Sequence, residues 1–199
     1  MQKVVDYYFA PVSPYAYLGH DRFVALAAKR GATVAVKPIN LGEVFPVSGG
    51  LPLAKRAPQR QAYRLAELQR WSAFLGKALH VQPKFFPVSG DLATGAILAA
   101  GELGTPQALA VAGAVGRALW EQQRDIADAA TMREILGECG LPAAALMARG
   151  GAPEIAARFA ALTQEAIARG VFGAPTYVYR DELFWGQDRL DFLDRALAQ

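Results

Sequence analysis

Residues 9–19, FAPVSPYAYLG, mark the passage from a strand into a helix. The preceding run, residues 4–9, is β-branched and aromatic (VVDYYF), which predicts a buried strand. Residues 15–29 contain no proline and end shortly before a glycine, which predicts a helix with a C-terminal stop. Ser13 therefore lies at the start of this helix, and Pro14 takes the first helical position, where a missing N–H costs nothing.

Ser13 has two interpretations at this place. As an ordinary N-cap, its hydroxyl accepts a hydrogen bond from a backbone N–H of the first turn. As a functional residue, it stands beside the unpaired N–H groups and partial positive charge of a helix start, where an anion can bind. The order of the remaining elements decides between these interpretations.

The composition describes a globular protein with large buried faces: 199 residues, 53% hydrophobic, with a mean hydropathy of +0.14. This length suits one domain, or one domain with a sizeable insertion. No apolar run approaches the roughly 18 residues of a membrane span, and the N-terminus has no signal-peptide pattern, so we expect a cytoplasmic protein without a membrane partner.

Few residues are available for metal or redox chemistry. The single cysteine, Cys139, excludes an internal disulfide and a dithiol oxidoreductase, and it fits a reducing compartment. His20 and His80 lack the spacing of metal ligands, so no metal site is expected. The net charge of +3 is spread among acidic residues, which argues against a nucleic-acid partner and leaves small anionic ligands plausible.

Beyond the first helix, the pattern predicts a second, parallel strand at residues 33–39 and a loop at 40–53. An amphipathic helix is predicted at 58–75, followed by an ordered aromatic loop at 81–90. Five more helices are predicted after this loop, at residues 93–100, 106–122, 131–138, 142–149 and 153–169.

The last thirty residues predict a β-hairpin, with strands at 176–179 and 182–185, and a closing helix from Asp188 to Ala198. Neither end of the chain can form a useful sheet alone, so the two ends are expected to join in one mixed four-stranded sheet. This is an α/β thioredoxin-like fold with a large all-helical insertion. The predicted division is a thioredoxin-like domain of residues 1–45 and 165–199 and an insertion of residues 46–164.

In this arrangement, Ser13 takes the place of the first redox cysteine of thioredoxin. Three motifs then stand out in order: SPYAYLG at 13–19, VFGAPT at 171–176 and FWGQDRL at 184–190, with LQRW at 68–71 between them. Together they resemble the glutathione-dependent 2-hydroxychromene-2-carboxylate isomerases of the thioredoxin superfamily, which are close to kappa-class glutathione transferases. The resemblance covers essentially the whole chain.

The resemblance implies glutathione as the cofactor and Ser13 as the catalytic residue, with its hydroxyl donating to the glutathione sulfur. A helix start and a hydroxyl donor both favour the thiolate form, whereas a cysteine would form a mixed disulfide. The resemblance also implies that the bond between Ala174 and Pro175 is cis, with the Ala174 backbone paired to the cysteinyl unit of glutathione. The alternative is a trans proline that opens a strand.

The resemblance implies further glutathione contacts in the turn formed by Trp185, Gly186, Gln187 and Asp188. Asp188 would take the α-ammonium of the γ-glutamyl group and nearby N–H groups its carboxylate; the alternative for Asp188 is an ordinary N-cap.

Two charged residues of the first inserted helix match kappa-class positions. Arg60 would pair with the glycyl carboxylate, and Glu67 corresponds to an aspartate contributed by the partner subunit. The alternative is that both are solvated surface charges. Where similar proteins carry an asparagine before this helix and polar residues after it, this chain has Leu53-Ala54 and Phe85-Phe86.

The expected activity is conversion of 2-hydroxychromene-2-carboxylate, a small aromatic carboxylate, to trans-o-hydroxybenzylidenepyruvate by reversible thiolate addition. Such a reaction belongs to aromatic-hydrocarbon catabolism, for example naphthalene degradation, and the family implies a homodimer. Phe85 and Phe86 would supply an apolar wall for the aromatic ring. The alternatives are a kappa-type transferase or peroxidase acting on another electrophile, and a non-catalytic thioredoxin-like binding protein.

Overall fold

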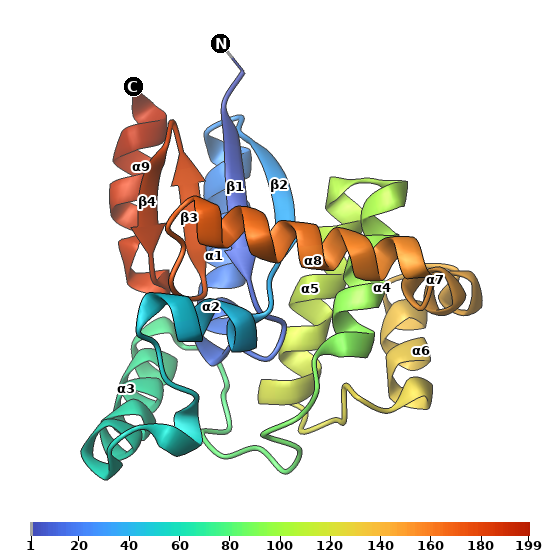
Figure 1. Cartoon of the computed structure of the whole chain (residues 1–199), viewed down its shortest axis with the longest axis horizontal. Helices are drawn as coiled ribbons and strands as arrows, with labels where there is room; N and C mark the ends of the chain where they lie inside the picture. The colour runs from blue at the N-terminus through green and yellow to red at the C-terminus, as the bar shows by residue number, and fades with distance from the viewer. Residues whose placement is uncertain (1) are drawn as a thin grey trace.

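The computed structural model describes residues 2–199, and its centre is a four-stranded sheet in the order β2-β1-β3-β4 (Figure 1). β1 runs parallel to β2 and antiparallel to β3, so the two ends of the chain meet in one sheet. The predicted thioredoxin-like fold is confirmed. The strands are β1 (Val4–Phe9), β2 (Thr33–Pro38), β3 (Thr176–Tyr179) and β4 (Glu182–Trp185).

β1 divides the core because its side chains alternate between the two faces of the sheet. Val5, Tyr7 and Phe9 belong to the main core cluster, whereas Tyr8 belongs to a second cluster on the other face. The Tyr7 ring stacks on Phe9 at 4.6 Å and on Tyr177 of β3 at 5.4 Å. These aromatic contacts fasten the N-terminal strand to the C-terminal hairpin.

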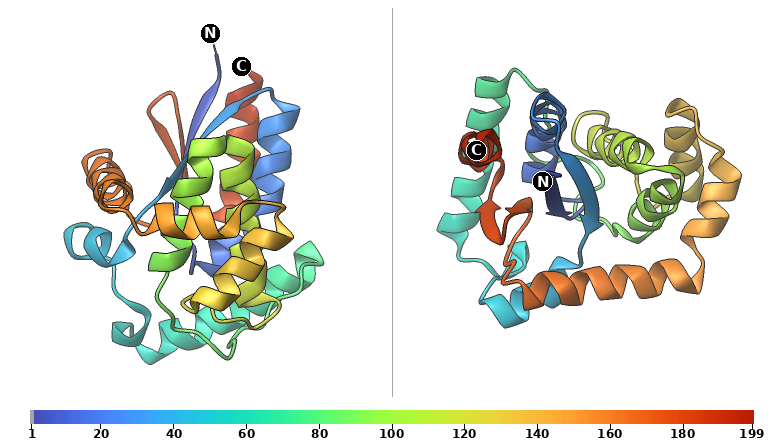
Figure 2. Two further views of the ribbon diagram at one scale, coloured as in Figure 1. Left: turned by 90° about the vertical axis from the view of Figure 1, so that its right-hand side faces the viewer. Right: turned by 90° about the horizontal axis from the view of Figure 1, so that it is seen from above.

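Helices cover both faces of the sheet. The main core joins β1 to α1 (Pro14–Lys29) and α9 (Leu190–Ala198). The second core cluster lies beneath α2 (Leu41–Ser48) and α8 (Pro153–Ala168), which contact each other. α8 runs across the front of both the sheet and the helical block (Figures 1 and 2). It contacts β2, α4 (Asp91–Leu103) and α7 (Ala143–Gly150).

Between β2 and α8 the chain forms helices and connecting loops without a strand, in agreement with the predicted all-helical insertion. α4 and α5 pack together beside β2, while α3 stands apart from them at the end of α1 (Figures 1 and 2). The predicted boundaries of the insertion, 46 and 164, stay a prediction. The helices are α3 (Pro58–Leu75), α4 (Asp91–Leu103), α5 (Thr105–Trp120), α6 (Ala129–Glu138) and α7 (Ala143–Gly150).

The predicted loop at residues 40–53 was wrong, because α2 occupies most of it. Asn40 caps α2, its Oδ1 accepting from the Gly42 N–H at 2.9 Å. Val44 is fully buried in the second core cluster, so packing outweighs the hydrogen bond lost at Pro46 within the helix. A short 3₁₀ turn follows at Leu53–Lys55.

Two smaller points concern the loop after α3 and the start of the last helix. The aromatic connector at 81–90 has no helix or strand, as predicted, and its Phe86–Pro87 bond is cis. The closing helix begins later than expected, with a 3₁₀ turn, η2 (Gln187–Arg189), preceding α9. Within residues 2–199, no helix has the length and apolar character needed to cross a membrane.

Candidate active site at the start of helix α1

Ser13 is the N-cap of α1 and also a bridge between the two ends of the chain. Its Oγ accepts from the Ala16 N–H at 3.2 Å and donates to the Ala174 carbonyl oxygen at 3.3 Å. The side chain is buried, with 8% of its surface exposed. An O–H···O bond usually spans 2.5–3.0 Å, so the bond to Ala174 is long, and its proton can turn to another acceptor at little cost.

The start of α1 keeps its positive partial charge. Its first turn contains no acidic residue. Pro14 has no N–H, and no hydrogen bond engages the Tyr15 N–H within residues 2–199. An anion beside Ser13 therefore meets a hydroxyl, a free N–H and the positive end of a sixteen-residue helix.

The bond between Ala174 and Pro175 is cis, which confirms the prediction. Gly186 N–H donates to the Pro175 carbonyl oxygen at 2.9 Å and so ties this turn to the end of β4. Gly173 has no room for a side chain, because a Cβ there would lie 2.4 Å from Nε1 of Trp185. In the described part of the chain the Ala174 N–H has no hydrogen-bond partner, which leaves a backbone edge open to an extended peptide.

The turn before α9 holds one buried and one exposed polar side chain. Gln187 is 2% exposed, and Nη1 of Arg22 donates to its carbonyl oxygen at 3.2 Å and to its Oε1 at 3.0 Å. Asp188 caps neither η2 nor α9, so the N-cap alternative does not describe it. Its Oδ2 accepts from Nη1 of Arg189 at 2.5 Å, and the carboxylate stays accessible to solvent.

Within residues 2–199, no hydrogen bond or ion pair joins either of the two charged residues predicted on α3 to Ser13. Arg60 is exposed, and its side chain forms no hydrogen bond or ion pair within residues 2–199. Glu67 accepts from Nη1 of Arg70 at 2.8 Å, and this hydrogen bond lowers the pKa of the Glu67 carboxyl.

Sequence reasoning missed two arginines near the site. Arg22 lies one turn beyond Gly19 on α1 and positions Gln187. Arg64 is buried on α3, where it shares a stripe with Leu68, Trp71 and Leu75 at helical spacing. A signal was present: an arginine in an otherwise apolar stripe of a helix is unusual.

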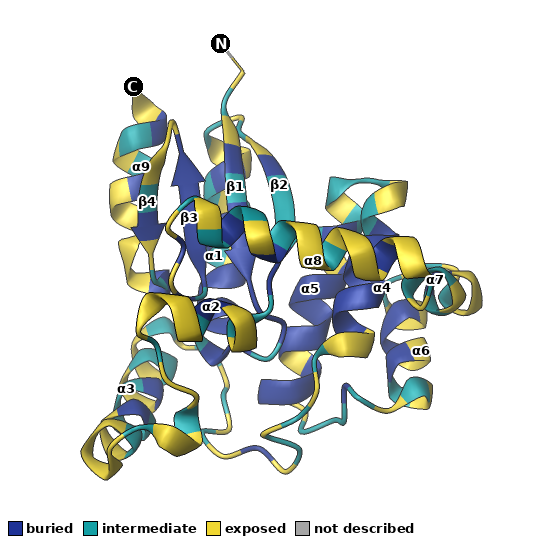
Figure 3. Ribbon diagram, viewed as in Figure 1, coloured by how far each residue is buried: buried dark blue, intermediate teal, exposed yellow. Residues whose placement is uncertain are grey.

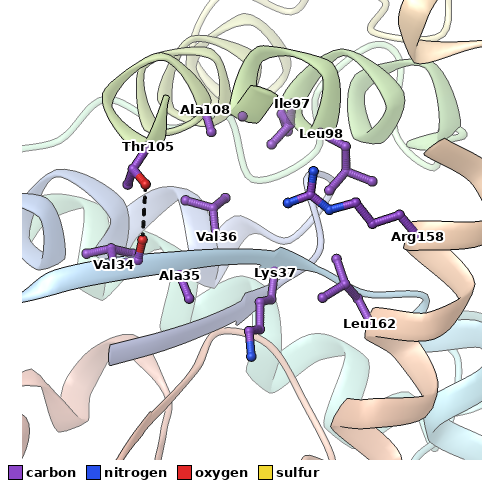
Figure 4. A pocket seen from close by; sticks show the side chains of 11 residues that line it. Val34, Ala35, Val36, Lys37, Ile97, Leu98, Thr105, Ala108, Arg158 and Leu162 are labelled. Carbon is purple, nitrogen blue, oxygen red and sulfur yellow. Dashed lines mark hydrogen bonds between the residues drawn. The ribbon is translucent and has the colours of Figure 1, made fainter. Parts of the chain in front are cut away.

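A separate cavity of about 170 Å³ lies between β2, α4, α5 and α8 (Figure 4). The Arg158 guanidinium reaches over it, and Thr105 Oγ1 donates to the Val34 carbonyl oxygen at 3.4 Å on its far side. None of its lining residues comes from 9–19 or 171–190, so this cavity is not part of the Ser13 site.

Known proteins match both the fold and the length of this chain. The model of the DSBA-like thioredoxin domain matches residues 4–198. A 2-hydroxychromene-2-carboxylate isomerase of Sphingobium xenophagum is 31% identical over 201 residues, which cover 99% of each chain. The chain belongs to the DSBA-like thioredoxin family, among the 2-hydroxychromene-2-carboxylate isomerases.

Two further relatives place this DSBA-like chain in its family. The solved structure of a 2-hydroxychromene-2-carboxylate isomerase superposes with a TM-score of 0.86 at 27% identity, over 98% of this chain and 94% of that one. Glutathione S-transferase kappa 1 of Caenorhabditis elegans is 33% identical over 82 residues, 41% of this chain and 36% of that protein. The resemblance seen in the three motifs is confirmed.

Proposed function

We propose that this chain is a glutathione-dependent isomerase that converts 2-hydroxychromene-2-carboxylate to trans-o-hydroxybenzylidenepyruvate. The observation that carries the proposal is the meeting of Ser13 Oγ and the Ala174 carbonyl at 3.3 Å, at a helix start with no cysteine nearby. A thiol brought to this place is held and polarised without being oxidised.

The residues present fit glutathione. Ser13 and the free N–H of the first turn of α1 suit its sulfur, and the open Ala174 N–H suits its cysteinyl unit. The exposed Asp188 carboxylate, which caps no helix, suits its α-ammonium. Trp185, Gly186 and Gln187 would act mainly by shaping the turns that hold Ala174 and Asp188. Arg60 remains a candidate for the glycyl carboxylate.

When bound, glutathione supplies the thiolate whose reversible addition to a conjugated double bond allows that bond to rotate. Ser13 serves this chemistry by turning its proton from the Ala174 oxygen toward the sulfur while its oxygen still caps Ala16. A free thiol titrates near 8.5, and a helix start lowers that pKa; each unit is worth about 1.4 kcal/mol. Cys139 lies at the end of α6, and burial raises the pKa of its thiol, so it is not a competing nucleophile.

The second substrate would lie against the connector between α3 and α4. A Cβ at Gly90 would be 3.3 Å from Cγ1 of Val12, so the end of this connector lies beside the residue that precedes Ser13. Phe85 and Phe86 pack half-buried against the main core. The connector is anchored by the Tyr17 hydroxyl, which donates to the Ala78 carbonyl oxygen at 2.8 Å.

The test is an assay of 2-hydroxychromene-2-carboxylate with the purified protein, with and without reduced glutathione, followed by chromatography of substrate and product. We expect conversion only when glutathione is present, with no net consumption of it. Conversion without glutathione contradicts the cofactor, and no conversion in its presence contradicts the isomerase.

The kappa-class relative favours a second candidate, transfer of glutathione to another electrophile. The same assay separates the two, because a transferase consumes glutathione in proportion to product and an isomerase does not. The homodimer implied by the family stays a prediction, which light scattering of the purified protein tests.

A further inference from the structure

Half of the residues of α3 are exposed (Figure 3). One of its two buried residues is an arginine. Arg64 is 8% exposed, and within residues 2–199 its guanidinium forms no hydrogen bond and no ion pair. Taking a charged group out of water is costly unless a partner of opposite charge compensates it. Arg64 has no such partner, and none of its guanidinium nitrogens is fully shielded from solvent, so its N–H groups are available to a ligand.

The neighbours of Arg64 are aromatic. Its guanidinium carbon lies 5.4 Å from the ring centroid of Phe86 and 5.9 Å from that of Trp120. Rings engage the flat faces of a guanidinium and leave the N–H groups along its edge free. Because an arginine stays protonated in proteins, Arg64 presents a permanent positive charge and a planar set of unused donors.

Arg64 also lies near the first turn of α1, which begins at Ser13. Burial raises the pKa of the Tyr15 hydroxyl, and the charge of Arg64 is the largest influence that opposes this rise. Tyr15 stands two residues after Ser13, in the first turn of α1. The guanidinium of Arg56 also acts on Arg64. Both arginines lower the pKa of the Tyr15 hydroxyl, whereas the Glu67 carboxylate raises it.

Resting on the proposed function, we propose that Arg64 binds the carboxylate of the second substrate, a planar aromatic acid whose ring packs against Phe85 and Phe86. The edge of a guanidinium matches a carboxylate in a two-point contact. The aromatic surroundings favour a ring-bearing acid over the flexible glycyl end of glutathione, for which Arg60 remains the candidate.

The probes are trans-cinnamate and its uncharged methyl ester, titrated by calorimetry into protein saturated with S-methylglutathione, which cannot react. We expect the wild-type protein to bind cinnamate at least tenfold more tightly than the ester. Arg64→Met should weaken cinnamate ten- to a hundredfold and leave the ester and glutathione within twofold. Arg133→Met, an exposed position on α6, removes the same charge and should change none of these affinities.

A wild-type protein that binds the ester as tightly as the acid overturns the proposal without any variant. It is also overturned if Arg64→Met weakens glutathione but spares γ-glutamylcysteine, because Arg64 then holds the glycyl carboxylate. Should Arg64→Met fail to fold, Arg64→Gln keeps a polar side chain and must show the same loss of preference for the acid.

The two proposals fail separately. If the wild-type protein isomerises the hydroxychromene carboxylate and Arg64→Met still prefers cinnamate to its methyl ester, only the proposed role of Arg64 is contradicted. If the wild-type protein does not isomerise the hydroxychromene carboxylate but Arg64→Met weakens cinnamate binding, the site for an aromatic acid is supported and the proposed reaction is contradicted.

Discussion

Gly19 of α1 lies directly against Gln187 of the turn before α9: a Cβ at Gly19 would be 2.8 Å from Cβ of Gln187. The same Cβ would be 3.0 Å from the Tyr177 hydroxyl, so little space is left on either side. The absence of a side chain lets the turn rest on α1, where Arg22 then holds Gln187. The helix that begins at Ser13 thereby also supports the turn that presents Asp188.

The first prediction is that Gly19→Ala lowers both the melting temperature and the affinity for glutathione. In an open helix, alanine is more stable than glycine by roughly 0.5–1 kcal/mol, so a loss of stability identifies the clash with Gln187. Gly137→Ala in α6 is the control, because a Cβ there meets nothing within 4 Å, and it should stabilise. Thermal denaturation and calorimetry measure both effects; a stabilised Gly19→Ala with normal binding would contradict the prediction.

The second prediction concerns Asp188, whose carboxylate caps no helix. Asp188→Ala should weaken glutathione binding by about 1.5–3 kcal/mol, the worth of a hydrogen bond to a charged group, with little change in stability. Asp191→Ala, in the first turn of α9, removes another exposed carboxylate and should leave binding unchanged. Equal losses in the two variants would show a general effect of charge rather than a contact at Asp188.

The third prediction separates the cap and the donor at Ser13. Ser13→Ala should cost about 1 kcal/mol of stability, because the Ala16 N–H loses its acceptor. As the donor to the sulfur, its loss should slow isomerisation by about one to three orders of magnitude with nearly unchanged glutathione affinity. Asp128→Ala is the control, because it removes the cap of α6, which accepts from the Thr131 N–H at 2.7 Å, and should keep the wild-type rate.

A second variant of Ser13 tests whether the glutathione sulfur binds beside this residue. Ser13→Cys keeps a donor of similar size but places a thiol where the glutathione sulfur binds, so a mixed disulfide should form and appear in the intact mass. If Ser13→Ala melts lower yet isomerises at the wild-type rate, Ser13 is a cap alone.

The fourth prediction is a loss of stability in mild acid, caused by His20. Its Nε2 donates to the Leu109 carbonyl oxygen at 3.0 Å, and burial lowers the pKa of the ring to about 4. Because the unfolded ring titrates near 6.5, the unfolded state binds more protons between these values. Above about pH 6.5, His20 is neutral in both states and does not lower the free energy of unfolding. As the pH falls from 6.5 toward 4, protonation of the unfolded ring lowers this free energy by about 3 kcal/mol in total.

Urea denaturation between pH 7 and 5 measures this slope. His20→Gln keeps a donor for Leu109 but cannot titrate, so its stability should be lower at pH 7 and nearly flat over the same range. An unchanged slope in His20→Gln would assign the acid sensitivity to other groups.

Local patterns were sufficient for most of the secondary structure. The bounds of β1, α3 and both hairpin strands agree with the sequence pattern, because proline, glycine and apolar spacing act within a few residues. α2 was missed for the converse reason. Pro46 and the glycines around it predict a loop, whereas burial of Val44 in the second core cluster, where α2 contacts α8, makes a helix.

The candidate site divides in the same way. The sequence alone determined that Ser13 begins a helix, that no cysteine accompanies it, and that the chain carries the motifs of its family. Only the tertiary structure decided that Ser13 Oγ reaches the Ala174 carbonyl, 161 residues away, and that Arg64 lies buried among Phe86 and Trp120 without a counter-charge. Capping depends on neighbours along the chain, whereas burial and electrostatic partners depend on which distant segments pack together.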